Sequence, residues 1–360
     1  MPLGRVALVH DYLNQRGGAE RVFAHFASAW PDAPVYTALY DPKVASDIVE
    51  PDRVRVSYLG KVPGANTIFR ALAPFYPRAF EAFDFSEFDT IISSTTAWAK
   101  GVIVPPGAIH VCYINTVSRF AFDADRYVGG FGPAALARPL IAQLIEWDKR
   151  AAQRPTRFVA NSRNVADRVK KYYGRDAEVL ACPVDVDRFT IGSGSGDYFA
   201  IASRLLPYKR LDLAIRAAQI AGVPLKIAGT GPDEKRLREL ARGTTTELLG
   251  YIGDAVVNTL LGNARAAILP GEEDFGLVPI EAAATGRPTI AYRGGGALET
   301  ILDGETGEFF SDATPESLAA SLRAFEPDRY DARRLRTHAE TFAPAQFIAR
   351  LKEIVAATRA

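Results

Sequence analysis

Short runs of aliphatic and β-branched residues alternate with longer amphipathic stretches along almost the whole chain. Short apolar runs are typical of strands buried on both faces, and the longer periodic stretches are typical of helices that cover a sheet. The alternation therefore predicts parallel sheets with helices on both faces. The predicted strands are Val6–His10, Pro34–Leu39, Val54–Leu59, Thr90–Ser94, His110–Asn115, Arg157–Ala160, Tyr198–Ala202, Leu225–Ala228, Glu247–Leu249, Ala266–Leu269 and Thr289–Tyr292, and the predicted helices include Leu211–Ala221 and Pro232–Ala241.

A Gly/Ser-rich segment, Thr190–Asp197, interrupts this alternation near the middle of the chain, and its composition is typical of a flexible linker. We therefore predict an α/β protein of two doubly wound, Rossmann-like domains, residues 1–188 and 189–342. The two domains are expected to face an interdomain cleft, where the strand ends of both sheets would bind a ligand. Apolar residues at helical spacing in Ala345–Thr358 predict that residues 343–360 form a helix that packs back on the first domain.

Composition narrows the class of protein. The chain has 360 residues, 48% hydrophobic and 24% charged, which suits two globular domains. Its 43 basic and 42 acidic residues nearly cancel, so no global field favours nucleic acid. Cys112 and Cys182 form no CxxC pair, so neither a disulfide framework nor a zinc site is expected. The sequence shows no secretory signal pattern and no apolar run of membrane-spanning length, and we expect a cytoplasmic protein.

Gly17 and Gly18 follow the first predicted strand and open a predicted helix. Glycines at such a place let backbone amides approach an anion, and the helix N-terminus adds partial positive charge, so a phosphate would be stabilised there. A helix-starting turn in which glycine merely supplies a positive φ explains the pair equally well.

Arg204 and Lys209 lie in the loop that follows the first strand of the second domain. A planar guanidinium and a mobile ammonium could together neutralise the two charges of a departing diphosphate. A charged loop is often only solvated surface, but a position at the carboxyl end of a buried strand favours anion binding.

Glu273 and Glu281 bracket the sequence Phe275-Gly276-Leu277, and a helix is predicted to begin near Val278. Backbone amides at that helix start suit a phosphate, and the two carboxylates suit the vicinal hydroxyls of ribose and hexose. The alternative is a helix-capping acid followed by a solvated glutamate, which the two other anion-binding loops on the same side of the predicted cleft disfavour.

These three stretches, in this order and spacing, resemble the retaining glycosyltransferases of family 4, which have the GT-B fold. Within that family the chain resembles bacterial mannosyltransferases of surface polysaccharide or glycolipid synthesis. The resemblance extends over nearly the whole chain and includes Ala160–Ser162, Pro183–Phe189, Gly229–Pro232 and Ala282–Pro288.

The resemblance implies a hexosyltransferase that uses a nucleotide sugar as co-substrate and needs no cofactor. Arg204, Lys209 and the glycine amides would hold the diphosphate, Glu281 the ribose and Glu273 a hydroxyl of the donor sugar. The residues implied to bind the donor are Gly17, Gly18, Gly229, Tyr251, Ile252, Phe275, Gly276, Leu277 and Glu281, and those implied to be catalytic are Asn115, Arg204, Lys209 and Glu273.

In retaining enzymes of this type the acceptor is thought to attack the face from which the nucleotide leaves, and the leaving phosphate oxygen takes the acceptor proton. Catalysis then depends on stabilising the diphosphate as its charge grows. Relatives with a similar Gly-Gly-Ala-Glu loop favour mannose from GDP-mannose, and UDP-sugars stay open as donors. The implied acceptor is a glycan or a lipid-linked acceptor.

Asn115 stands where the family implies a histidine, and Val117 stands where related chains often have proline. Asparagine can hydrogen-bond a sugar hydroxyl, but it cannot act as a base or become cationic near pH 7. The remaining histidines lie in predicted strands and helices, where structural roles are common; they are His10, His25, His110 and His338.

Two carboxylate pairs resemble metal ligands, Asp123 with Asp125 and Asp185 with Asp187. Neither pair is expected near the diphosphate, and the cationic side chains already supply the compensation that a divalent metal would give. We predict no metal.

The run Tyr58–Arg78 mixes aromatic side chains with Lys61, Arg70 and Arg78. This composition suits a lipid-linked acceptor and a peripheral contact at the inner face of the plasma membrane. A helix that only packs on its own domain is an equal alternative.

Two other classes of function stay open. Asn115 suits a nucleotide-sugar binding protein that has lost turnover. The fold would also suit a nucleotide-sugar epimerase or a phosphorylase, although the sequence shows no pyridoxal lysine pattern.

Overall fold

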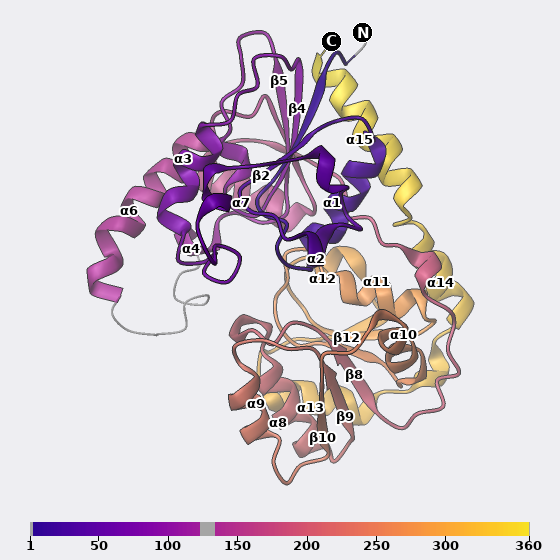
Figure 1. Ribbon diagram of the computed structural model, residues 1–360. Coiled ribbons are helices and arrows are strands. Elements are labelled where there is room, and N and C mark those ends of the chain that lie inside the picture. Colours follow the sequence, from indigo (N-terminus) through magenta and orange to yellow (C-terminus); the bar gives the residue numbers. More distant parts are fainter. Residues whose placement is uncertain (1–2, 123–133, 360) are drawn as a thin grey trace. The chain divides into compact units, whose positions relative to one another are not determined.

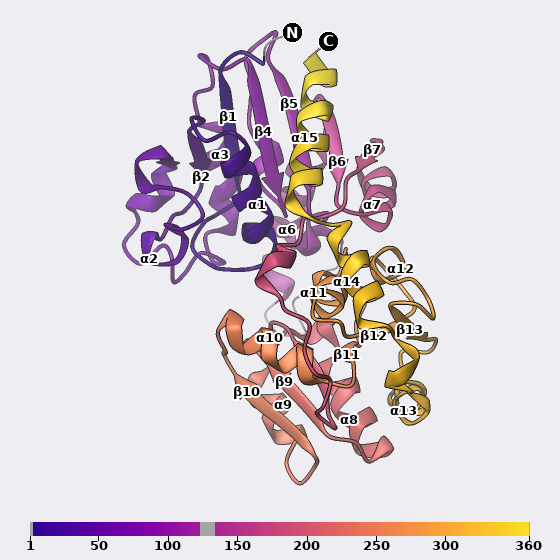
Figure 2. The ribbon, with the colours of Figure 1, turned by 90° about the vertical axis from the view of Figure 1, so that its right-hand side faces the viewer.

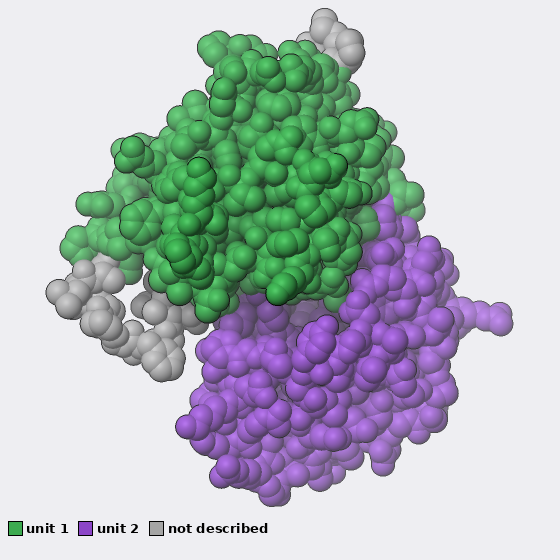
Figure 3. Space-filling view, in the orientation of Figure 1, with its two compact units in different colours: residues 1–183, 345–360 green, residues 184–344 purple. Residues whose placement is uncertain are grey.

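The computed structural model describes residues 3–122 and 134–359. The chain divides into two compact units, which Figure 3 colours green and purple. Unit 1 consists of Met1–Pro183 and Ala345–Ala360, and unit 2 is Val184–Pro344. The division falls between Pro183 and Val184.

The described part of unit 1 is drawn in Figure 1. It holds a seven-stranded sheet with the order β3-β2-β1-β4-β5-β6-β7. Every pair of neighbouring strands is parallel, as expected for strands joined by helical crossovers. The strands are β1 (Val6–His10), β2 (Val35–Thr37), β3 (Val54–Val56), β4 (Thr90–Thr95), β5 (Ile109–Ile114), β6 (Arg157–Ala160) and β7 (Ala177–Val179).

Helices cover this sheet, and the last helix of the chain, α15, packs on the same unit (Figure 2). Phe347 of α15 packs against Phe26 and Tyr113, with ring centroids 5.6 Å apart in both pairs. The helices of unit 1 are α1 (Gly18–Ala29), α2 (Pro42–Ala45), α3 (Tyr76–Glu81), α4 (Arg119–Phe122), α6 (Ala134–Ala151), α7 (Arg163–Tyr173) and α15 (Pro344–Arg359).

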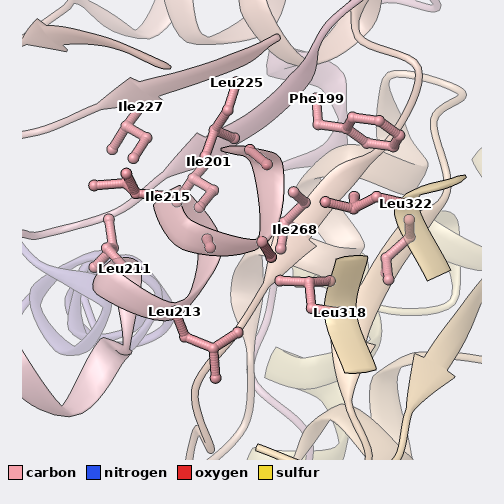
Figure 4. Close-up of a cluster of buried hydrophobic side chains, with 14 of the residues drawn as sticks. Phe199, Ile201, Leu211, Leu213, Ile215, Leu225, Ile227, Ile268, Leu318 and Leu322 are labelled. Carbon is pink, nitrogen blue, oxygen red and sulfur yellow. The ribbon is translucent and has the colours of Figure 1, made fainter. Parts of the chain in front are cut away.

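Unit 2 is a six-stranded parallel sheet with the order β10-β9-β8-β11-β12-β13. Aliphatic side chains of its strands and of α8 and α13 form one buried cluster (Figure 4). Its strands are β8 (Phe199–Ala202), β9 (Leu225–Ala228), β10 (Thr246–Gly250), β11 (Ala267–Leu269), β12 (Thr289–Tyr292) and β13 (Gly307–Phe310), and its helices are α8 (Leu211–Ala221), α9 (Glu234–Leu240), α10 (Asp254–Asn263), α11 (Leu277–Ala284), α12 (Ala297–Thr300), α13 (Pro315–Ala324) and α14 (Ala332–Glu340).

The predicted doubly wound α/β fold is confirmed, and each of the predicted strands is present to within a few residues. The prediction Val54–Leu59 is too long, because β3 ends at Val56. There the Ser57 side chain accepts a hydrogen bond from the Leu59 amide and starts a 3₁₀ turn, Tyr58–Lys61. The edge strands β7 and β13 were not predicted from the sequence.

The interpretation of Thr190–Asp197 as a flexible linker is wrong. The amide of Gly192 donates to the Thr285 carbonyl at 3.1 Å, and the amide of Gly194 donates to the Gly262 carbonyl at 3.0 Å. A Cβ atom at Gly192 would lie 2.2 Å from the Gly262 oxygen. Glycine is needed here for close packing on α10 rather than for flexibility.

Each sheet reverses its strand order at one point, between β1 and β4 in unit 1 and between β8 and β11 in unit 2. In open parallel sheets ligands bind at such switch points, outside the carboxyl ends of the strands. A ligand-binding site is therefore expected in the loops that follow these four strands.

Candidate active site

At the switch point of unit 2, Lys209 and Glu273 form an ion pair. Lys209 Nζ lies 2.5 Å from Glu273 Oε1, and the two side chains are 18% and 12% exposed. Lys209 ends the short 3₁₀ helix Pro207–Lys209 after β8, and Glu273 follows β11. The predicted cation and the first predicted carboxylate thus meet across the switch point.

The ion pair leaves little room between the two strand ends. The cavity lined by Ser203, Lys209, Pro270, Glu273 and neighbouring residues has a volume of about 10 Å³, roughly the space of one water molecule. Burial lowers the pKa of Lys209, but attraction to Glu273 and, to a smaller extent, to Tyr208 outweighs it, so the pKa is raised above its ordinary value. Lys209 is therefore charged at neutral pH.

Arg204, in the same loop, differs from Lys209 in its exposure and in its partners. Its side chain is exposed, and within the described residues it makes no ion pair with a carboxylate. An exposed guanidinium can bind a phosphate without first breaking an internal contact.

The start of α11 offers backbone donors beside this pair. Gly276 precedes the helix with φ +89°, which favours glycine, and as a glycine it has no side chain that could cap the helix. The first amides of a helix have no intrahelical acceptor, and Leu277 and Val278 are partly exposed. The Phe275 ring is buried against Phe342, so the contribution expected of this residue comes from its backbone.

Glu281 lies in α11, about one turn from its start, and is partly buried. Its place in the helix agrees with the prediction, and its proposed contact with ribose stays a prediction.

The loops after β8, β9 and β10 are joined by close backbone contacts. The Gly229 amide donates to the Gly250 carbonyl at 2.7 Å, and Gly229 has φ +132°. A Cβ atom at Gly229 would lie 1.9 Å from the Ser203 oxygen. Tyr251, which follows, is 81% exposed, whereas Ile252 packs against the unit 2 core. The proposed contact of this region with a base stays a prediction.

A glycine-rich loop after β12 supports Glu273 and was not predicted from the sequence. The Gly296 amide donates to the Glu273 carbonyl at 2.8 Å. A Cβ atom at Gly295 would lie 2.3 Å from the same carbonyl oxygen. Three consecutive glycines after a predicted strand, Gly294–Gly296, were the signal that could have identified this contact.

In unit 1, Gly17 caps α1 and Gly18 begins it. Gly17 has φ −142°, and neither glycine has a positive φ, so the alternative explanation by a left-handed turn is wrong. Glu20 in the first turn is buried and accepts a hydrogen bond from Gln15 at 3.0 Å. The phosphate-binding role of the two amides stays a prediction.

Asp11 was missed by the sequence analysis, although it organises this edge of unit 1. It directly follows β1, is buried, and accepts hydrogen bonds from the amides of Thr96, Ala97, Trp98 and Ala99 and from the hydroxyls of Thr95 and Thr96. A single carboxylate thus holds the loop after β4 against the end of β1.

Asn115, directly after β5, is 8% exposed. Its Nδ2 donates to Ser94 Oγ at 3.1 Å and to the Thr95 carbonyl at 3.2 Å. The Thr95 carbonyl can only accept, which fixes the orientation of the amide. Its Oδ1 makes no hydrogen bond within the described residues.

Three of the histidines contact residues of their own unit, and the prediction of structural roles for them stays a prediction. His10 stacks on Phe23 with its Nδ1 3.1 Å from the Ser94 carbonyl oxygen, and His338 contacts the Thr300 carbonyl. His110 is buried with its Nε2 2.7 Å from Ser93 Oγ. Burial and the nearby Arg154 lower the pKa of His110 to about 3.

Within residues 3–122 and 134–359, no group of three or more metal-ligating side chains comes together. The Asp187 side chain is 97% exposed and lies near Arg336 rather than near Lys209. Asp123 and Asp125 lie outside the described residues.

The two units match two family models in chain order. Residues 16–188 match the model Glycosyltransferase Family 4, and residues 185–342 match the model Glycosyl transferases group 1.

Curated relatives match over shorter stretches. A D-inositol 3-phosphate glycosyltransferase of Geodermatophilus obscurus is 30% identical over 230 residues, which cover 53% of this chain and 50% of the relative. A GDP-mannose-dependent alpha-(1-6)-phosphatidylinositol dimannoside mannosyltransferase of Mycobacterium tuberculosis is 36% identical over 156 residues, 41% of this chain and 40% of the relative. The chain thus spans about half or less of these relatives' length.

Solved structures share the fold over nearly the whole chain. HepE of Anabaena, in complex with UDP and glucose, has a TM-score of 0.71 at 17% identity and covers 98% of this chain and 100% of its own. Sucrose-phosphate synthase of Thermosynechococcus elongatus has a TM-score of 0.72 at 16% identity, with 98% of each chain covered. The chain therefore has the GT-B fold of these solved structures, and its two halves each match a glycosyltransferase family model.

Proposed function

We propose that this protein is a retaining, metal-independent glycosyltransferase that moves a hexose from a nucleotide sugar to a glycan or lipid-linked acceptor. The observation that carries the proposal is the Lys209–Glu273 pair at the unit 2 switch point, beside the exposed Arg204 and the start of α11 at Gly276. Two cations and the first backbone amides of a helix suit a diphosphate, and carboxylates suit sugar hydroxyls.

In the proposed reaction, the bond between the sugar C1 and the phosphate oxygen breaks while a bond from C1 to the acceptor oxygen forms on the same face. The acceptor proton passes to the leaving phosphate oxygen, so no side chain has to act as a nucleophile. Arg204, Lys209 and the amides of Gly276 and Leu277 stabilise the charge that grows on the diphosphate.

Asn115 fits this proposal as a positioning contact for the donor sugar. Its two amide hydrogens are engaged by Ser94 and Thr95, so its Oδ1 is left to accept a sugar hydroxyl. It cannot serve as a base. The proposed mechanism needs none, because the leaving phosphate takes the proton.

We propose GDP-mannose as the donor. The support is the mannosyltransferase-like loop around Gly17 and Gly18 and the mycobacterial relative whose name states GDP-mannose dependence. Thermal unfolding with GDP, UDP and ADP tests this choice, because a ligand that binds the folded state raises the unfolding temperature. A shift with UDP and none with GDP would replace the donor but keep the reaction.

Transfer and hydrolysis assays with GDP-mannose and UDP-glucose test the reaction itself. Product in the presence of a glycan or lipid-linked acceptor supports a transferase. Donor binding without product, with product restored by Asn115→His, would instead support a binding protein that has lost turnover. An epimerised sugar released without acceptor would support an epimerase.

Glu281→Ala tests the proposed ribose contact. A lost hydrogen bond between a carboxylate and ribose hydroxyls should weaken donor binding by about 1 to 3 kcal/mol. Calorimetric titration with GDP and GDP-mannose measures this loss, which should be similar for both ligands because both carry ribose. Unchanged binding would rule out the ribose assignment.

We also propose a peripheral membrane contact through the segment Tyr58–Arg78. Within the described residues, no helix is long and apolar enough to cross a membrane. The segment is anchored by buried Leu59 and Leu72, whereas Tyr58, Ile68 and Phe75 are exposed. Tyr58 donates a hydrogen bond to the Phe75 carbonyl at 3.3 Å, so two of these exposed aromatic residues are neighbours.

Vesicle co-sedimentation tests this contact. Wild-type protein should sediment with vesicles that contain anionic phospholipid, and the double variant Ile68→Ser with Phe75→Ser should stay in the supernatant. Val256, exposed on α10 of unit 2, provides the control variant Val256→Ser. Equal sedimentation of wild type and double variant would contradict the contact.

A further inference from the structure

The ion pair of Lys209 with Glu273 affects how a ligand can bind at this site. Its ammonium is already paired with Glu273 at 2.5 Å, whereas Arg204 makes no ion pair within the described residues. A diphosphate can therefore approach Arg204 at once, but it must compete with Glu273 for Lys209.

Glu273 depends on that partner. Its Oε1 is buried and has no well-aligned hydrogen bond in the described structure, so the charge of Lys209 is its compensation. A carboxylate that is 12% exposed has little water to replace a lost counter-ion. Moving Lys209 to a phosphate leaves a poorly compensated negative charge beside two more negative charges.

A bare nucleoside diphosphate cannot repair this loss, because its terminal phosphate only accepts hydrogen bonds at neutral pH. A nucleotide sugar brings hydroxyl groups to the same place, and hydroxyls donate to carboxylates. The cost of breaking the ion pair is thus recovered with the sugar present and not without it.

We propose that the Lys209–Glu273 ion pair makes this site discriminate between an intact nucleotide sugar and a bare nucleoside diphosphate. Glu273 is then a specificity-determining residue that weakens retention of the product nucleotide. The proposal rests on the proposed function, because it requires that unit 2 bind a nucleotide sugar at this switch point.

Calorimetric titration with GDP and GDP-mannose, and in parallel with UDP and UDP-glucose, tests the proposal on the full chain. Glu273→Gln removes the charge and nearly keeps the shape. We expect it to bind the nucleoside diphosphate more tightly than wild type, by roughly five- to tenfold, and to lose the wild-type preference for the nucleotide sugar. Glu273→Ala gives the same comparison if the glutamine variant does not fold.

Glu272→Gln is the matched control, because Glu272 is the preceding, exposed residue of the same loop and the change removes the same charge. Its affinity for the diphosphate should stay close to that of wild type. An equal gain in Glu272→Gln would show a general effect of loop charge and overturn the proposal.

A double-mutant cycle separates release of Lys209 from simple relief of repulsion. If the gain in affinity for the nucleoside diphosphate depends on the release of Lys209, Glu273→Gln should give no such gain in a Lys209→Met background. A gain that persists there, or no gain in Glu273→Gln alone, overturns the inference while the proposed function stands. Absence of binding of either nucleotide pair to the wild type would instead overturn the proposed function.

Discussion

At the scale of single residues, the two cations of the loop after β8, Arg204 and Lys209, differ in burial and in ion pairing. Lys209 is partly buried and paired with a carboxylate, whereas Arg204 is exposed and has no carboxylate partner in the described structure. The sequence places both at a strand end, which is why they could be predicted as candidates. It does not reveal the pairing, because the contact depends on how the loops after β8, β11 and β12 pack.

Arg204→Ala should weaken binding of the nucleotide sugar by about 1.5 to 3 kcal/mol, because a charged hydrogen bond to phosphate is lost. The unfolding temperature should not change, since the described structure gives Arg204 no ion pair to lose. Calorimetric titration and a thermal melt measure the two quantities. Arg216→Ala, on the exposed face of α8, is the control, and an equal loss of binding in that variant would remove the specific role of Arg204.

Asp11 shows the limit of sequence reasoning at this scale. A lone aspartate after an apolar strand has many explanations, and its hydrogen bonds go to residues more than eighty positions away. The predicted roles of Gly17, Gly18, Tyr251 and Glu281 are contacts with a ligand, so they await the binding measurements.

At the scale of elements, the strands could be predicted because their interiors are continuous apolar runs. The edge strands β7 and β13 were not predicted, and a glutamate interrupts the apolar residues in the sequence of each. The segment Thr190–Asp197 was misinterpreted because glycine serves two purposes, flexibility and close approach, and composition alone does not separate them.

Gly192→Ala tests whether glycine is needed at this position for close approach to α10. The added methyl group would lie 2.2 Å from the Gly262 oxygen, and overpacking of this kind should destabilise unit 2 by about 1 to 3 kcal/mol. Thermal unfolding followed by circular dichroism measures the change. Gly253→Ala is the control, because nothing lies within 4 Å of its added Cβ and its φ is −70°; a flexible linker would predict equally small effects of both substitutions.

At the scale of the whole molecule, two doubly wound units follow from the alternation of strand and helix patterns. The stability of unit 1 should depend on pH through His110. Its pKa is about 3 in the folded protein, against an ordinary value of 6.5. Below pH 6.5 the unfolded chain binds a proton that the folded unit does not, so stability is complete above pH 6.5 and falls as the pH drops towards 3.

The expected slope is about 1.4 kcal/mol per pH unit once the pH is well below 6.5. Urea unfolding at pH 7 and pH 5, followed by tryptophan fluorescence, measures it for unit 1 alone, because Trp30, Trp98 and Trp147 all lie in that unit. His110→Gln should lose clearly less stability than wild type between these two pH values. Parallel losses would show that other groups carry the acid sensitivity.

The return of α15 to unit 1 has a consequence for synthesis of the chain. Phe347, Leu351, Ile354 and Val355 are buried and belong to unit 1, yet the ribosome makes them only after all of unit 2. Unit 2 is continuous in sequence and can fold as soon as it emerges. The first half of the chain must wait with part of its apolar surface uncovered, so this half is the one that chaperones are expected to guard during translation.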